Sequence, residues 1–314
     1  DTMRKKHFLF ASVLALLCSS STLHAQDFKL TSSGYFKNQG VDVMAFDDIY
    51  PEGHQGGVCI IMNGHRVATN GDIRLEATPG QWQPVPKQLD RKLGDNSITA
   101  TLCYPDSSRH LTGFNPMIYP DLHLIYTVNV ESKGKNIEVT VDLDRPIPQE
   151  FIGKVGFNLE FFPGSLFGKP WIMDGQSGIF PQQPNSPLMT TQPNYLHTGN
   201  YHDGKKSLAD MDKLIGKGYS PIVADDIISE PYAKGTKFTS RPDDPYNKVT
   251  IESLSGDLQL FDGRMNHNNG WFVLRSNIKP GVTKGAVKWI ITPNVVADWM
   301  YQPVIQTSQI GYHP

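Results

Sequence analysis

Aromatic and amide side chains that could bind a sugar are the residues with the clearest chemical potential in this sequence. Sugar rings present apolar C–H faces that stack on aromatic side chains, while Asn, Asp and His side chains bind the hydroxyls. For each aromatic residue, ordinary packing is an equally good interpretation. The candidate binding residues, all in segments expected to be loops, are Trp82, Trp171, Asp174, Tyr195, Tyr201, His267, Asn268 and Asn269.

Carboxylates offer a weaker case for catalysis. Asp225-Asp226 and Asp243-Asp244 are adjacent pairs, and neighbours on an extended chain point to opposite sides, so neither doublet forms a catalytic pair by itself. The sequence has no Gly-x-Ser-x-Gly nucleophile motif, no phosphate-binding loop and no zinc-type spacing of Cys and His. We therefore predict no catalytic residue, metal ligand or cofactor.

Length and charge limit the classes of function. The 314 residues suffice for one large domain or two small ones, and the formal net charge is −2. A chain without a basic excess lacks the electrostatic signature of a nucleic-acid-binding protein. With 28 Gly, 23 Pro and 10% aromatic residues, the composition is typical of a turn-rich β protein.

The first residues resemble a secretory signal peptide. A basic stretch at residues 4–6 precedes an apolar run that ends at Leu17 and is too short for a stable membrane-spanning helix. We expect cleavage after Ala25 and a periplasmic or cell-surface location. A retained membrane anchor is the alternative. Lipidation of Cys18 is disfavoured, because the position before it holds Leu rather than a small residue.

Strand patterns dominate the rest of the chain. Residues 122–131 and 137–143 alternate apolar and polar side chains, and Lys133-Gly134 between them predicts a hairpin turn. A second hairpin is predicted at Asn63-Gly64, and Asn70-Gly71 predicts a further turn. The strands expected around these two turns cover residues 58–62, 65–68 and 73–76. Further strands are expected at residues 97–103, 155–162, 249–254, 258–261, 271–275 and 286–291.

Residues 26–300 are expected to form a large two-sheet β-sandwich, with two smaller packed sandwiches as the alternative. One short helix is predicted at residues 208–215, and residues 181–203 have the composition of a long surface loop. Trp289 alternates with apolar neighbours and is expected in the core. After cleavage two cysteines remain, Cys59 and Cys103, and the sequence does not decide between a disulfide and two buried thiols.

The segment at residues 303–314 carries the most specific motif. Its Ser308-Gln309-Ile310-Gly311-Tyr312-His313-Pro314 resembles the Ser-Gln-Val-Gly-Tyr-x-Pro opening of the immunoglobulin-like domain that precedes the catalytic domain in glycoside hydrolase family 9. The body of the chain resembles the large amino-terminal β-sandwich of some family 9 enzymes of Bacteroidetes type, through residues 168–180 and 262–273. Together with the signal peptide (1–25), this resemblance divides the chain into a sandwich (26–300) and the start of an immunoglobulin-like domain (301–314).

The resemblance implies a parent endo-β-glucanase-type enzyme that acts on a β-linked plant polysaccharide such as a β-glucan or xyloglucan. That family inverts configuration on an (α/α) barrel and uses an Asp-Ala-Gly-Asp segment, which this sequence lacks. The expected role is thus a non-catalytic module that braces the downstream domains or binds polysaccharide. The alternatives are a free-standing secreted carbohydrate-binding protein and a self-contained polysaccharide lyase or hydrolase on a β-sandwich.

Overall fold

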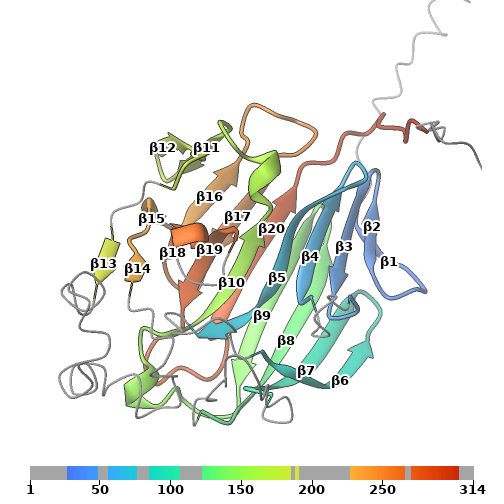
Figure 1. Cartoon of the computed structure of the whole chain (residues 1–314). Helices are drawn as coiled ribbons and strands as arrows, with labels where there is room; N and C mark the ends of the chain where they lie inside the picture. Colours follow the sequence, from blue (N-terminus) through green and yellow to red (C-terminus); the bar gives the residue numbers. More distant parts are fainter. Residues whose placement is uncertain are drawn as a thin grey trace, which may run out of the picture.

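Two large antiparallel sheets make up most of the part of the chain that the structure describes (Figure 1). The computed structural model describes residues 27–48, 56–75, 85–106, 122–184, 188–190, 227–265 and 270–303. Each large sheet has nine strands. The expected two-sheet sandwich is therefore confirmed, in the form of one large sandwich rather than two smaller ones. In the described residues, no helix is long and apolar enough to cross a membrane.

The strands pair as follows. The first sheet has the spatial order β1 (Lys29–Leu30), β2 (Phe36–Asn38), β3 (Val41–Ala45), β4 (Val58–Met62), β5 (His65–Leu75), β10 (Val155–Phe161), β19 (Phe272–Asn277), β18 (Leu258–Asp262) and β15 (Ala233–Gly235). The second has the order β12 (Gln176–Ile179), β11 (Pro170–Met173), β16 (Lys237–Ser240), β17 (Val249–Ser253), β20 (Val287–Pro293), β9 (Asn136–Leu143), β8 (Leu124–Lys133), β7 (Ser97–Tyr104) and β6 (Lys87–Leu93). A separate pair joins β13 (Leu188–Thr190) to β14 (Ile227–Ser229), and the 3-10 turns are Gln149–Phe151, Pro163–Ser165 and Gly263–Met265.

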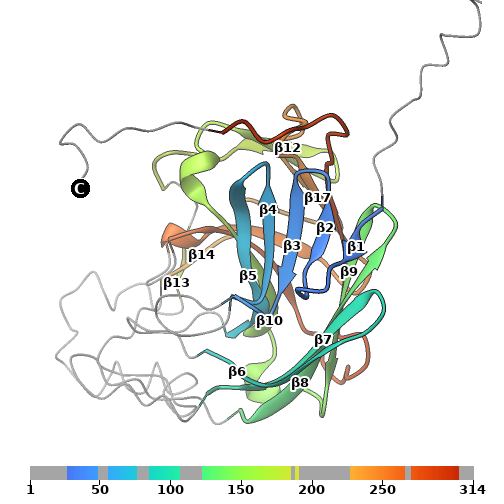
Figure 2. The ribbon, with the colours of Figure 1, turned by 90° about the vertical axis from the view of Figure 1, so that its right-hand side faces the viewer.

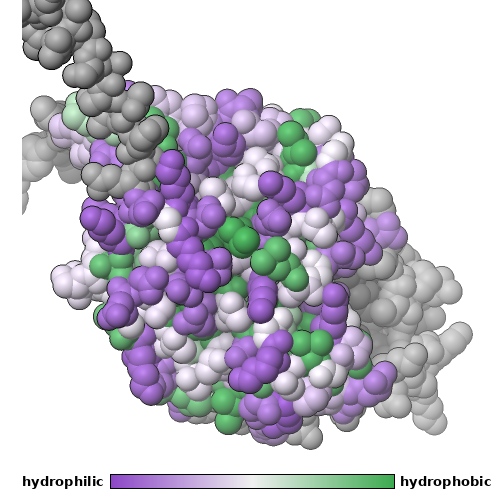
Figure 3. Space-filling view, turned by 180° about the vertical axis from the view of Figure 1, so that it is seen from behind, coloured by the Kyte–Doolittle hydropathy of each residue, from purple (hydrophilic) through white to green (hydrophobic). Residues whose placement is uncertain are grey.

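The core lies between the two sheets. Strands β7, β8 and β9 alternate buried and more exposed side chains, so one face packs inward and the other faces outward. Aromatic contacts join the sheets: the ring of Phe157 on β10 lies 5.0 Å from that of Trp289 on β20, and Phe161 lies 5.8 Å from Phe238. Trp289 is 1% exposed, which confirms its expected place in the core. From behind, the surface is mainly hydrophilic, with scattered hydrophobic residues (Figure 3).

The two Asn-Gly signals have different outcomes. Asn63 and Gly64 both have positive φ (52° and 83°) and form the predicted tight turn between β4 and β5. Asn70 also has a positive φ of 55°, but the predicted turn at Asn70-Gly71 is wrong, because β5 runs unbroken through it. Its register against β4 and β10 shifts there, which marks a β-bulge. A Cβ on Gly71 would lie 2.6 Å from that of Val58, so only glycine fits at this close approach.

Other expectations have mixed outcomes. The hairpin between β8 and β9 is confirmed, although Lys133 pairs with Asn136 and so lies on the strand rather than in the turn. Cys59 and Cys103 are both free thiols: Cys59 is buried in the first sheet, and Cys103 lies on β7 in the second. The short strand β13 lies within the expected loop at residues 181–203. The predicted helix at residues 208–215 lies outside the described residues.

An arginine joins the two sheets at one edge. Strand β6 is the last strand of the second sheet, beside the edge of the first that ends in β1 (Figure 2). Arg91 on β6 donates from Nε to the carbonyl of Ala45 at 2.9 Å and from Nη2 to the carbonyl of Gly34 at 2.6 Å. These bonds connect backbone of the first sheet to the outermost strand of the second.

Candidate functional site

An open cleft of 670 Å³ lies at the edge of the first sheet. One side comes from β1, β2, β3 and the turns beside them, and the other from residues 294–303, here called the strap. In Figure 1 the strap is the red segment that leaves β20 and passes the upper ends of β5, β4 and β3. The lining residues of this edge cleft are Asp27, Lys29, Thr31, Lys37, Asn38, Gln39, Gly40, Asp42, Ile61, Gly64, Ala297, Trp299 and Tyr301.

Strand register places the polar side chains of the edge cleft in a row. Lys29 lies opposite Lys37, and Lys37 lies opposite Asp42, so their side chains share one face of the sheet. The Lys37 ammonium contacts an Asp42 carboxylate oxygen at 3.2 Å. With Asp27, the lining holds two cationic and two anionic side chains, a formal charge of 2 − 2 = 0. This wall offers both hydrogen-bond donors and hydrogen-bond acceptors and carries no net charge.

The strap supplies the aromatic side of the edge cleft. Trp299 lies against Gly40, where a Cβ would come within 2.6 Å of its ring, and Gly40 has a positive φ of 66°. The Gln39 side-chain amide donates to the Trp299 carbonyl. Tyr301 is 68% exposed, and its ring lies 6.5 Å from that of Trp299 at an interplanar angle of 67°. Two partly exposed rings thus face a charge-balanced polar wall.

These features suit a neutral, hydroxyl-rich ligand. The cleft volume lies within the roughly 300–1,000 Å³ typical of small-ligand sites. The partly exposed indole of Trp299 and the exposed phenol of Tyr301 offer apolar faces to sugar C–H groups, and amide, ammonium and carboxylate groups bind hydroxyls. Among the described residues, no cluster of His, Cys, Asp and Glu is arranged to hold a metal ion.

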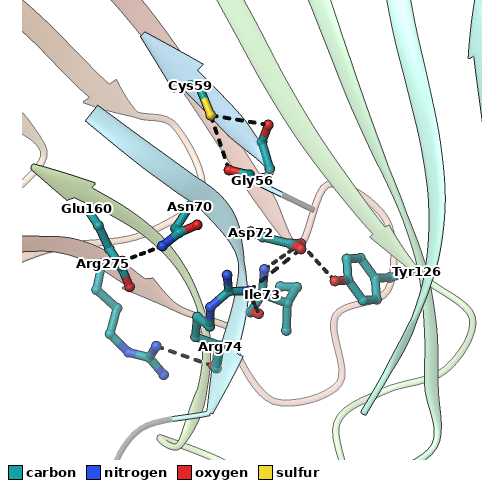
Figure 4. Close-up of polar contacts among 10 residues, drawn as sticks. Gly56, Cys59, Asn70, Asp72, Ile73, Arg74, Tyr126, Glu160 and Arg275 are labelled. Atoms are coloured by element: carbon teal, nitrogen blue, oxygen red, sulfur yellow. Dashed lines mark hydrogen bonds and ion pairs between the residues drawn. The ribbon is translucent and has the colours of Figure 1, made fainter. Parts of the chain in front are cut away.

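A second polar group of residues is buried in the first sheet (Figure 4). Asp72 on β5 is fully buried, accepts a 2.7 Å hydrogen bond from the Tyr126 hydroxyl and lies 3.7 Å from an Arg74 guanidinium nitrogen. Burial opposes the charge on Arg74, but Asp72 and Glu160 outweigh it and raise the pKa of Arg74. Burial and the Asp72 charge hold the pKa of Tyr126 well above its usual value, so its hydroxyl remains a donor.

Arg275 extends this network to β10. Its guanidinium donates to Asn158 Oδ1 at 2.7 Å and to the carbonyls of Lys154 and Arg74 at 2.5 and 3.4 Å. On the same strand as Asn158, Glu160 accepts from the Asn70 side-chain amide at 2.7 Å. Buried charges bonded in this way act as an internal brace between β5, β10 and β19.

Cys59 does not have the surroundings of a nucleophile. Burial raises the pKa of its thiol, and the hydrogen bond with the Thr69 hydroxyl at 3.1 Å only partly opposes that effect. A reactive cysteine needs a lowered pKa and access to solvent, and this thiol has neither.

Trp171 and Asp174 are the predicted site residues that the structure describes. Trp171 lies on β11, not in a loop, and is only 5% exposed. A Cβ on Gly178 would meet its ring at 2.5 Å, so the indole is packed and has no face open for stacking. The other candidates lie outside the described residues: Trp82, Tyr195, Tyr201, His267, Asn268 and Asn269.

Asp174 has a structural role in the turn between β11 and β12. It and Gly175 both have positive φ (45° and 84°), the backbone of an Asp-Gly hairpin turn. Its carboxylate accepts from the backbone N–H groups of Thr236 and Lys237 at 2.5 and 3.0 Å, joining the turn to β16.

The edge cleft residues Trp299 and Tyr301 were not predicted from the sequence. The one pattern that could have indicated them is an aromatic pair two positions apart.

The pH dependence of this turn is a testable consequence. The Thr236 N–H bond, followed by the Thr236 hydroxyl and Lys237, lowers the pKa of Asp174 in the folded state. A lowered folded pKa gives stability that is present above the unfolded value, about 3.9, and is lost as pH falls through the folded pKa. We expect Asp174→Asn to unfold at a lower urea concentration than the wild type at neutral pH. The difference should shrink toward acid; a pH-independent difference would contradict this explanation.

Comparisons with known proteins leave the function open. No family model matches the chain, and no curated protein matches it. Two solved structures are similar over most of their length. The Slr1438 protein from Synechocystis sp. PCC 6803 has a TM-score of 0.35 and 9% identity over 85% of this chain and 94% of its own. HI1317 has a TM-score of 0.29 and 7% identity over 85% and 98%. These low values assign neither a family nor an activity.

Proposed function

We propose that this domain is a non-catalytic, glycan-binding module of a secreted enzyme that degrades β-linked plant polysaccharide. The supporting observation is the edge cleft, in which Trp299 and Tyr301 face a charge-balanced polar wall. The family 9-like motif at residues 303–314 follows directly on the strap and supports the enzyme context. In this proposal, the edge cleft that binds glycan lies beside the strap that leads to the downstream domains.

A neutral glycan suits the edge cleft best. The paired Lys37 and Asp42 side chains and the zero formal charge of the lining give no preference for an acidic sugar. The cleft is open rather than enclosed, so it suits a stretch of a polysaccharide chain. Trp299 is expected to stack on one sugar ring while the side chains of β1–β3 bind hydroxyls.

Trp299→Ala tests this proposal. We expect the substitution to weaken binding of cello-, mixed-linkage or xyloglucan oligosaccharides about tenfold, equivalent to roughly 1.4 kcal/mol, because it removes the stacking face. Isothermal titration calorimetry on the exported chain measures the affinity. Tyr246→Ala is the matched control, since Tyr246 is an exposed aromatic residue (49%) that does not line the edge cleft.

Three outcomes decide the proposal. Saturable binding that Trp299→Ala weakens and Tyr246→Ala leaves intact supports it. Saturable binding unaffected by Trp299→Ala places the glycan elsewhere on the domain. New reducing ends or unsaturated products released by the chain alone would overturn the non-catalytic role and establish a self-contained hydrolase or lyase.

A further inference from the structure

The strap is a wall of the edge cleft, but few contacts hold it to the domain. At its start, Asn294 is bonded through its backbone N–H to the Lys248 carbonyl at 2.9 Å and through its side chain to the Pro245 carbonyl at 2.7 Å. Val295 still packs against the core. From there to residue 303, within the described residues, the hydrogen bond that reaches the sheet is the one from Gln39 to the Trp299 carbonyl.

The outer part of the strap is correspondingly open to solvent. Met300 is 76% exposed and Tyr301 is 68% exposed. The Trp299 N–H bonds only within the strap, to the Val296 carbonyl at 3.1 Å. Segments with few buried contacts and exposed backbone open at low free energy. The Trp299 ring against Gly40, the Gln39 hydrogen bond and the Tyr301 ring near Gly64 attach residues 296–303 to the sheet.

We propose that a glycan bound in the edge cleft fixes the strap against the sheet, so that occupancy controls the direction in which the chain continues past Pro303. This inference rests on the proposed glycan binding. A ligand in the cleft touches β1–β3 on one side and Trp299 and Tyr301 on the other. It binds the attached strap better than the detached one, and it shifts the population toward attachment by that difference in affinity.

Linkage makes the effect reciprocal. Any change that detaches the strap must weaken glycan binding by the same factor by which the glycan favours attachment. Couplings of this kind usually correspond to about 5- to 150-fold in affinity. The strap thus joins the two roles expected of the module, because binding glycan and bracing the neighbouring polypeptide become one equilibrium.

Hydrogen exchange of the full chain tests the coupling. We expect backbone amides at residues 296–302 to exchange several-fold more slowly when a cello-, mixed-linkage or xyloglucan oligosaccharide saturates the edge cleft. Amides of β17 and β20, paired in the second sheet, serve as the internal reference and should not change. Unchanged exchange at residues 296–302 under saturating glycan would overturn the inference while leaving glycan binding intact.

A glycine substitution tests reciprocity. In Gly40→Ala the added Cβ would lie 2.6 Å from the Trp299 ring, so we expect the strap to detach and glycan affinity to fall at least about fivefold. Gly281→Ala is the matched control, because Gly281 has a similar φ of 73° but nothing within 4 Å of the added Cβ. The Gly281→Ala variant carries a similar backbone strain and should bind glycan with the affinity of the wild type.

Gln39→Ala provides a milder variant should Gly40→Ala fold poorly. It removes the hydrogen bond to the Trp299 carbonyl and should speed exchange at residues 296–302 while weakening glycan binding in parallel. Faster exchange with unchanged affinity in this variant would contradict the coupling. If the wild type shows no saturable glycan binding, the proposed function itself is rejected. The titration therefore tests glycan binding, and hydrogen exchange tests only its coupling to the strap.

Discussion

Trp289→Ala is expected to lower the free energy of unfolding by about 3–5 kcal/mol, the range for removing a large aromatic side chain from a core. Trp289 is 1% exposed on β20 and its ring packs edge-on to Phe157 across the sandwich, at 5.0 Å. Its indole Nε1 also donates to the Ser276 hydroxyl at 3.0 Å. The substitution therefore leaves a cavity between the sheets and removes a buried hydrogen bond.

Urea unfolding followed by circular dichroism measures this loss. The transition midpoint should fall while its slope stays constant, since the same surface is exposed on unfolding. Trp299→Ala is a useful comparison because it removes the same side chain from the strap, outside the core, and should change stability little. A loss below about 1 kcal/mol for Trp289→Ala, the centre of the distribution for ordinary mutations, would show that the core tolerates this cavity.

Arg275→Met should destabilise the first sheet to a similar degree, by several kcal/mol, because each buried acceptor left without its donor costs about 1–3 kcal/mol. The change keeps much of the side-chain length but removes the guanidinium that binds Asn158 and the carbonyls of Lys154 and Arg74. Those buried acceptors lose a donor.

The comparison with Arg275→Lys separates charge from geometry. Lysine retains the charge but lacks the planar fork, so we expect only partial recovery of the midpoint in urea. Lys133→Met is the surface control, because the ion pair of Lys133 with Glu138 is solvent-exposed and its loss should leave the midpoint unchanged. Equal midpoints for Arg275→Met and the wild type would mean that the network does not brace the sheet.

Strands with one buried face and one exposed face could be predicted from the sequence. Strands β8 and β9 each show the alternation that follows from packing against the other sheet, and both were found within two residues. Most of the strands that were missed are short or lie at sheet edges; β3, with five residues inside the first sheet, is an exception. Strands β1 and β2 have two and three residues, too few for a period-two pattern, and β6 exposes most of its side chains. Their places are set by pairing with neighbours.

The error at Asn70-Gly71 has a physical origin. Asn-Gly favours positive φ, and a tight turn and a β-bulge both need it, so the local sequence cannot separate them. Because β5 pairs with both β4 and β10, the strand continues through these residues and forms a bulge instead of a turn. Trp171 is a comparable case: its neighbours Pro170 and Gly175 suggested a loop, while the register with β16 places it on a strand.

The edge cleft could not have been found from sequence. It depends on the register that puts Lys29 beside Lys37 and on a strap distant along the chain that crosses beside Gly40. No local pattern connects these segments, since their proximity follows from the order of strands in the sandwich. The aromatic residues that the sequence did single out were chosen by local composition, which carries no information on exposure.

The link made by Arg91 bears on how this protein avoids self-association. An outermost strand offers unpaired backbone groups on which another molecule could add a strand. Strand β6 exposes Leu89 and Leu93, but it also carries Lys87, Asp90, Arg91 and Lys92. Arg91 also ties this strand to the first sheet through the Ala45 and Gly34 carbonyls, which restricts its movement away from the sandwich. We expect the charged side chains and this tether together to disfavour the addition of a strand from a second copy.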